Sequence, residues 1–166
     1  MLGFYPGFPE YPHKIIQLKN MASIKRLQQR IINTLYELNC RQTGIDWSLE
    51  PSVSEFTVTF EFGIAEDRNF NYLDMDEAEK ALKAIDGKPF KVLDFFCAIC
   101  YYRMKKGESK PLKFDYYMLR MLFDKKMLEV RIFHERGPRR ISPEELASFI
   151  IRKVNENLPR KILKPI

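Results

Sequence analysis

The chain has 166 residues, of which 45% are hydrophobic and 30% are charged, and its net charge is +6. This length and composition predict one globular domain with its own core, and they exclude a disordered chain. No apolar run reaches the roughly 18 residues of a membrane span, and the first residues lack the pattern of a signal peptide. Three cysteines are too few for a disulfide scaffold, so we expect a cytoplasmic protein.

The first third of the chain predicts an arm, a strand and a helix. Residues 1–13 are rich in proline, glycine and aromatic side chains, and we expect them to run extended over the surface. A short strand is predicted over 14–18. Asn20 is then expected to cap a helix that stops at Gly44 and has this apolar stripe: Met21, Ile24, Leu27, Ile31, Leu35 and Leu38.

The middle third predicts a strand followed by a second helix. Apolar and polar residues alternate over 56–62, which is typical of a half-buried strand. Asp74 is expected to cap a helix that ends at Gly87, and the acidic residues around it favour a helix N-terminus over a calcium loop. The side chains that this helix is predicted to bury are Met75, Ala78, Leu82 and Ile85.

Two strands that are apolar on both faces are predicted over 93–104 and 114–123, with a turn over 106–111 between them. Residues 124–126 are expected to reverse the chain into a third strand over 127–134. A sheet that is apolar on both faces must be covered on both. Helices cover one face, and we expect the other to be covered by a second copy in a homodimer or by the aromatic residues of the arm: Phe4, Tyr5, Phe8 and Tyr11.

The start of the last helix is the strongest local signal. Ser142 is predicted to cap the helix, Pro143 suits its first position, and Glu145 completes a capping box. Ile141 and Leu146 have the spacing of a hydrophobic staple across this start. The three preceding strands and this helix predict an α+β fold in which an antiparallel meander sheet wraps a long C-terminal helix.

The predicted order of elements is strand, helix, strand, helix, three strands, helix. This order resembles the TATA-box-binding-protein-like (TBP-like), or helix-grip, arrangement. The stretches 53–62, 93–104 and 141–158 are also similar to a small uncharacterised family from hyperthermophilic archaea. The resemblance covers residues 14–158, which we expect to form a single domain before a tail over 159–166. It implies a fold and no activity, and because the chain lacks the paired phenylalanine wedges of a TATA-binding saddle, no functional residue is carried over.

Few residues are typical of catalysis or of metal binding. Cys97 and Cys100 lie within one predicted strand, where residues three apart point to opposite faces, so we expect buried cysteines that bind no metal. His134 is interpreted as an ordinary histidine at the end of a strand. Since no nucleophile, base and orienting residue come together and no cofactor motif occurs, we expect neither an enzyme nor a cofactor.

Charge is distributed unevenly, with a net −7 over 47–87 and a net +8 over 88–140. A basic surface attracts phosphate backbones through counterion release, although the same residues are more often typical of a solvated face. Tyr101, Tyr102, Tyr116 and Tyr117 are either stacking platforms for bases or core residues. The candidate contacts for a nucleic acid or another anion are Lys125, Lys126, Arg136, Arg139 and Arg140.

Three functions remain open at this point. The first is a non-enzymatic binding or interaction module that associates with itself. The second is a nucleic-acid-binding accessory protein that uses the basic surface. The third is a carrier of a small hydrophobic ligand, with its pocket between the sheet and the C-terminal helix.

Overall fold

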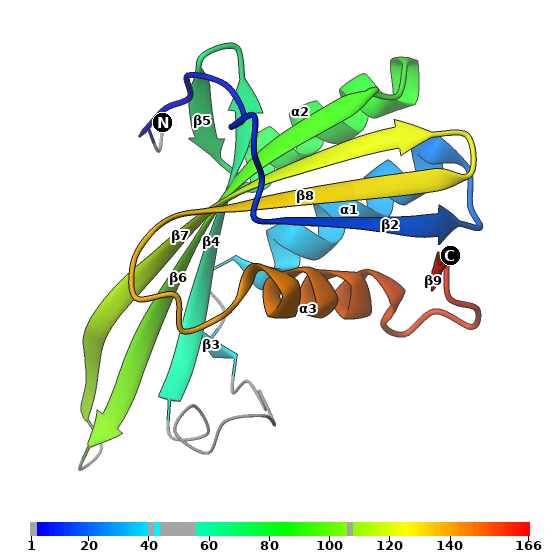
Figure 1. The fold of residues 1–166 in the computed structure, drawn as a ribbon. Helices are drawn as coiled ribbons and strands as arrows, with labels where there is room; N and C mark the ends of the chain where they lie inside the picture. The colour runs from blue at the N-terminus through cyan, green and yellow to red at the C-terminus, as the bar shows by residue number, and fades with distance from the viewer. Residues whose placement is uncertain (1–2, 40–41, 44–55, 106–107) are drawn as a thin grey trace.

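An antiparallel sheet of nine strands and three helices form the fold in this computed structural model, which describes residues 3–39, 42–43, 56–105 and 108–166 (Figure 1). The strands are β1 (Gly3–Phe4), β2 (Lys14–Asn20), β3 (Gln42–Thr43), β4 (Phe56–Glu66), β5 (Asn69–Tyr72), β6 (Val92–Lys105), β7 (Glu108–Asp124), β8 (Met127–Arg136) and β9 (Leu163–Pro165). The helices are α1 (Ile24–Leu38), α2 (Met75–Gly87) and α3 (Pro143–Asn155).

Across the sheet the strand order is β1-β5-β4-β6-β7-β8-β2-β9, and β3 pairs with β4 outside this path. The α+β class and the antiparallel meander of β6, β7 and β8 are therefore confirmed. With 13 residues, α3 is no longer than α2, so a long C-terminal helix is not what the chain forms. Among the described residues, no helix is long and apolar enough to cross a membrane.

One hydrophobic core joins the three helices to one face of the sheet, which we call the inner face. Buried side chains from each helix belong to this core, among them Leu27, Ile85 and Leu146. In the strands, alternate residues point to this face, for example Phe60 of β4 opposite Ile99 of β6. The other face, which we call the outer face, carries a second and smaller hydrophobic cluster.

Helix α1 begins one turn later than the sequence predicted. Its N-cap is Ser23, whose Oγ accepts a hydrogen bond of 3.1 Å from the N–H of Arg26. Asn20 instead ends β2, and its Oδ1 accepts a bond of 3.0 Å from the N–H of Ala22. Met21 therefore precedes the helix and is 52% exposed, so its predicted place in the apolar stripe is wrong.

The predicted end of α1 is also wrong. The helix stops at Leu38 because Asn39 adopts an extended conformation, and its side chain bonds to β4 and to the start of α2. Its Oδ1 accepts a bond of 2.6 Å from the N–H of Phe62, and its Nδ2 donates one of 2.7 Å to the carbonyl of Leu73. Gly44, the predicted stop, lies outside the described residues.

Asp74 caps α2 as predicted, and its side chain accepts a bond of 2.9 Å from the N–H of Glu77. Ala78 and Ile85 are buried, whereas Met75 is 60% exposed and its predicted burial is wrong. At 3.6 residues per turn, Met75 lies about 60° around the helix axis from Ala78, at the margin of the buried stripe.

Strand β7 begins earlier in the chain than predicted. Lys105 pairs with Glu108, so residues 108–111 belong to a strand and their assignment to a turn is wrong. The register shifts between Tyr101 and Tyr102, and Pro111 pairs at this irregularity. A bulge is a position where a strand tolerates proline, which donates no hydrogen bond to its neighbour.

The start of α3 has the predicted geometry. Ser142 Oγ accepts a bond of 3.1 Å from the N–H of Glu145, and Pro143 occupies the first position of the helix. Ile141 and Leu146 are 1% and 0% exposed and lie in the same core, as a hydrophobic staple requires.

We expect Ser142→Ala to lower the free energy of unfolding by about 1 kcal/mol, because the N–H of Glu145 loses its acceptor. In a chain of this size the melting temperature would fall by about 2–4 °C. Ser148→Ala, an exposed position of the same helix, is the matched control and should not lower it. Equal melting temperatures for Ser142→Ala and the unmodified chain would contradict the capping role.

Candidate functional site

The N-terminal arm covers one part of the outer face (Figure 1). The ring of Tyr5 is 7% exposed and lies against Phe70, with the ring centroids 4.5 Å apart. Its hydroxyl donates to Asp94, which also accepts two bonds, of 2.8 and 2.9 Å, from the guanidinium of Arg120. That guanidinium carbon lies 5.1 Å from the ring centroid of Phe8.

The sequence left two ways to cover the outer face, and part of this cover is intramolecular. Tyr5 and Phe8 pack on the sheet as the arm hypothesis predicted. Phe4 and Tyr11 do not, since they are 67% and 79% exposed. The arm therefore covers the sheet around β5 and the facing parts of β6 and β7, and leaves the remainder of the outer face without it.

His13 fixes the far end of the arm to β8. Its ring stacks on Phe133 with 4.5 Å between centroids, and its Nδ1 accepts a bond of 2.9 Å from the N–H of His134. An imidazole that accepts at Nδ1 is neutral and carries its proton on Nε2. Partial desolvation of this otherwise exposed ring, and then the nearby charges of Arg139 and His134, lower the pKa of His13 below its usual value of 6.5.

This contact should weaken in acid. The folded-state pKa of His13 lies below that of the unfolded chain, so its contribution is complete above pH 6.5 and is lost as the pH falls through the folded value. A titration of the His13 ring followed by NMR should give a midpoint below 6.5. Leu substituted for Phe133 removes the stacked ring and should move that midpoint upward, and a midpoint above 6.5 in the unmodified chain would contradict the contact.

Beyond the arm, the outer face presents a row of aromatic rings. Phe96 of β6 and Tyr116 of β7 have centroids 5.7 Å apart, and Phe114 follows 5.9 Å from Tyr116. The guanidinium carbon of Arg136 lies 4.2 Å from the centroid of the Tyr116 ring. These four residues form what we call the aromatic–arginine face. Phe114 is 42% exposed, so the row is open to solvent at this end.

Two features of the sheet place Arg136 on this face. The register between β7 and β8 shifts between Tyr116 and Tyr117, which sets Tyr116 opposite Arg136 and Tyr117 opposite His134. A bulge of this kind redirects side chains relative to the regular alternation. Tyr116 and Arg136 thus share the outer face, while Tyr117 and His134 point to the inner face.

A buried carboxylate on the inner face holds the loop that follows β8. Asp115 is 0% exposed and accepts bonds of 2.7 and 3.0 Å from the backbone N–H groups of Arg139 and Arg140. It also accepts a bond of 2.6 Å from the hydroxyl of Tyr101, and lies 2.9 Å from Nε2 of His134. Arg139 adopts a left-handed φ of 57°, which the bond to Asp115 stabilises. Asp115 is therefore an anchor for the loop and not a surface contact.

His134 lies near the end of β8, as predicted, and its side chain takes part in a buried cluster that the sequence did not indicate. Alternate residues of a strand point to the same face, so His134 points to the inner face as Ile132 does. Its side chain therefore lies in the same buried cluster as Asp115. Asp115 was missed by the sequence reasoning, although one signal was present. It is the single acidic residue within the apolar run 114–123, and a buried carboxylate requires partners.

The sequence left the four tyrosines of β6 and β7 as either core residues or stacking platforms, and the structure places two of them in the core and two on the outer face. Tyr101 and Tyr117 are 0% exposed and belong to the core, and burial raises the pKa of both far above the usual range. The hydroxyl of Tyr117 donates to the carbonyl of Ile141, which ties β7 to the start of α3. Tyr102 and Tyr116 are partly exposed residues of the outer face.

The structure separates the five basic candidates into two groups. Arg136, Arg139 and Arg140 are exposed together at the end of β8 and in the loop after it. Lys125 and Lys126 lie in the turn before Met127, at the opposite end of β8. At 3.3 Å per residue this strand separates the groups by roughly 30 Å. The lysines and the arginines therefore do not form one site.

Cys97 and Cys100 are both buried, as predicted. Cys97 lies in the main core, whereas Cys100 pairs with Thr59 on the outer face. Burial raises the pKa of both thiols above the usual value, which disfavours the reactive thiolate. Within the described ranges, no group of three or more His, Cys, Asp or Glu residues is arranged to hold a metal ion.

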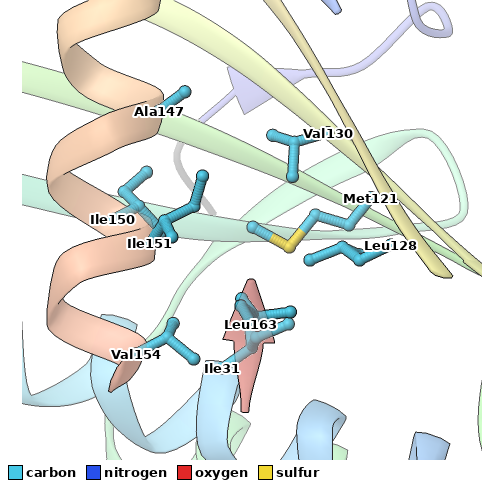
Figure 2. A pocket seen from close by; sticks show the side chains of 9 residues that line it. All are labelled: Ile31, Met121, Leu128, Val130, Ala147, Ile150, Ile151, Val154 and Leu163. Atoms are coloured by element: carbon cyan, nitrogen blue, oxygen red, sulfur yellow. The ribbon is translucent and has the colours of Figure 1, made fainter. Parts of the chain in front are cut away.

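A small cavity lies between the sheet and α3 (Figure 2). Its volume is about 10 Å³, and the side chains of Met121, Ile150 and Val154 are among those that line it. A volume of this size holds at most about one water molecule, and its apolar walls offer that water no partner. A wider groove of about 710 Å³ is open to solvent between β2, α3 and β9, with Ile16, Ile151 and Leu163 among its lining residues.

No protein-family model, no curated protein and no solved structure matches this chain. The resemblance to a TBP-like fold and to an archaeal family therefore stays a prediction.

Proposed function

We propose that the chain is a binding module for single-stranded nucleic acid and that the aromatic–arginine face contacts the strand. The observation that carries this proposal is the guanidinium of Arg136 lying 4.2 Å from the Tyr116 ring, with Phe96 and Phe114 on either side. Proteins hold unpaired bases by stacking them on aromatic rings and on arginine planes. Phe96 packs against the smaller hydrophobic cluster, but core packing gives no reason for the end of the row at Phe114, which is 42% exposed.

The loop after β8 adds positive charge at the end of the strand that carries Arg136. Arg139 and Arg140 are exposed, and their backbone is fixed by two hydrogen bonds to Asp115. A loop that is already ordered loses little conformational entropy when it binds. The guanidinium carbon of Arg140 lies 5.8 Å from the centroid of the Tyr101 ring, toward the inner face, so we assign the phosphate contacts to Arg136 and Arg139. Phosphate contacts supply most of the affinity for nucleic acids.

The test is fluorescence anisotropy with a labelled DNA strand of about 16 nucleotides, titrated at several salt concentrations. We expect Arg136→Ala combined with Arg139→Ala to weaken binding by about ten-fold or more at low salt. Removal of two phosphate contacts should also reduce the slope of log K against log salt by about 1.4. Phe114→Ala should weaken binding without changing this slope, because it removes a stacking ring and no charge.

The matched control is Lys125→Ala combined with Lys126→Ala. It removes the same charge at the opposite end of β8, so affinity should change by less than about two-fold. Equal losses for the two double variants would show that binding depends on net charge and not on this face. An absence of binding at low salt would contradict the proposed function.

Self-association as a homodimer is the second candidate, and exposed apolar residues of the outer face favour it. Phe114 is 42% exposed and Ile15 is 49% exposed, although the arm already covers Phe70 and Met118. Light scattering at micromolar concentration should then give twice the chain mass of 19.8 kDa. A monomer would contradict the dimer and leave the face available to nucleic acid.

Three other expectations from the sequence concern the type of fold, the cellular compartment and a hydrophobic ligand. The pairing of β2 with β8 brings together the first and last long strands, which supports a helix-grip or TBP-like arrangement. Cys97 and Cys100, the free cysteines among the described residues, favour the cytoplasm, where thiols stay reduced. A carrier of hydrophobic ligands has no support from the cavity beneath α3, which is too small for such a ligand.

A further inference from the structure

The aromatic row does not end where the N-terminal arm begins. Phe96 belongs to the aromatic–arginine face, and its ring centroid lies 5.4 Å from that of Phe70. Phe70 in turn carries the ring of Tyr5 at 4.5 Å. The successive rings Phe114, Tyr116, Phe96 and Phe70 therefore form one continuous row across the outer face, and the arm lies on its last member.

Two side chains of the arm occupy positions suited to flat rings. The ring of Tyr5 packs against that of Phe70 at a tilt of 39°, and its hydroxyl donates a hydrogen bond to Asp94. Phe8 lies against the guanidinium of Arg120, 5.1 Å from its carbon, and Arg120 is itself held by Asp94. An aromatic ring and an arginine plane are the two surfaces on which proteins stack unpaired bases.

We propose that Tyr5 and Phe8 are internal occupants of two base-binding subsites, and that a single strand displaces the arm to occupy them. This inference rests on the proposed function and extends it to the part of the row that the arm covers. The bound strand would then contact the whole row from Phe114 to Phe70. The arm acts as a competitor of the strand, so the affinity of the intact chain is reduced by the fraction of molecules in which the arm is closed.

Asp94 gives the covered subsites a preference among bases. Its carboxylate accepts a hydrogen bond from the Tyr5 hydroxyl, so it would equally accept one from an exocyclic amino group. Cytosine and adenine present such a group, and carboxylates accept hydrogen bonds from the amino group of cytosine. Thymine and uracil present a carbonyl oxygen at the equivalent position, which a carboxylate repels. The subsites should therefore prefer amino-bearing bases.

The backbone of the arm around Tyr5 is attached to the sheet by few hydrogen bonds, so its side-chain contacts hold most of this part of the arm. Strand β1 has two residues, and its pairing with β5 joins Gly3 to Phe70 and Phe4 to Asn69. The N–H of Tyr5 donates one further bond, of 2.7 Å, to the carbonyl of Arg68. Segments with few ladder bonds and exposed side chains, such as Phe4, open more easily than the core of a sheet.

The experiment compares Tyr5→Ala combined with Phe8→Ala against the intact chain, with DNA strands of about 16 cytosines or thymines. We expect the double variant to bind oligo-dC about five-fold more tightly than the intact chain, and oligo-dT with a smaller gain. Tyr11→Ala is the matched control, because this ring lies on the same arm and is 79% exposed. It should leave both affinities unchanged.

A second measurement uses the intact chain and does not depend on the folding of a variant. Hydrogen exchange of the Tyr5 N–H should become about ten-fold faster when oligo-dC is bound, because its bond to Arg68 breaks as the arm leaves. Unchanged exchange in the bound state, together with equal affinities of the intact chain and the double variant, would overturn the inference and leave the proposed function standing. No binding by either protein at low salt would overturn both. Binding by the double variant alone would support the inference.

Discussion

Replacing Asp115 with alanine should lower the free energy of unfolding by about 3–5 kcal/mol. The substitution removes the shared acceptor of the Tyr101 hydroxyl and of the backbone N–H groups of Arg139 and Arg140, and it removes the partner of His134. Buried donors without an acceptor lose their hydration and gain nothing in return. Urea denaturation followed by circular dichroism measures the change.

Two further variants make this result specific. Asp115→Asn keeps the size of the side chain and one acceptor oxygen, so it should lie between alanine and the unmodified chain. Asp86→Ala removes an exposed carboxylate, whose partner is Lys25, and should leave the unfolding midpoint unchanged. An Asp115→Ala protein as stable as the Asp86→Ala control would contradict the role of Asp115 as the anchor of the loop.

Local signals predicted the helix starts at Ser142 and Asp74 correctly. A helix cap is a hydrogen bond between a side chain and the N–H group three residues later, so both partners lie close together in the sequence. The prediction of the start of α1 was wrong because Asn20 and Ser23 are both good caps and lie only three residues apart, so local signals do not distinguish them. Met21 fits the apolar spacing of the helix by coincidence, and tertiary packing favours Ser23.

The Asp115 cluster could not be predicted because its partners are distant in the chain. Tyr101 is 14 residues away and Arg140 is 25 residues away, and their meeting depends on the register of two hairpins. That register includes a shift at Tyr116, which periodicity alone does not reveal. The sequence shows that both faces of β6 and β7 are apolar. It does not show the role of Asp115 in β7, because that role depends on the position of the loop after β8.

The sequence also could not predict which part of the outer face is covered by the arm and which part is open to solvent. The arm was one of two predicted covers, but Tyr5 and Asp94 are 89 residues apart, and nothing local pairs them. Phe4 and Tyr11 resemble Tyr5 and Phe8 in type and spacing, yet they are exposed. The small strands β5 and β9 were not predicted for the same reason, because their pairing with β4 and β2 supplies most of their stability.

Gly137→Ala should lower the free energy of unfolding by about 2–4 kcal/mol, a large effect for one methyl group. Gly137 has a φ of +115°, which side chains other than glycine rarely adopt. An added Cβ would lie 2.4 Å from the carbonyl oxygen of Phe114 and 2.5 Å from Oδ1 of Asp115. Because these atoms are backbone and a fixed carboxylate, the loop would have to move away from Asp115.

Gly87→Ala at the end of α2 provides the matched control for this prediction. Its Cβ would meet nothing within 4 Å and its φ is not left-handed, so the same substitution should be neutral or stabilise by up to about 1 kcal/mol. Displacement of the loop also moves Arg139, so Gly137→Ala should weaken binding of the DNA strand while Gly87→Ala does not. Similar melting temperatures for the two variants would show that Gly137 is free of the close contacts to Phe114 and Asp115, and that the loop does not depend on them for its position.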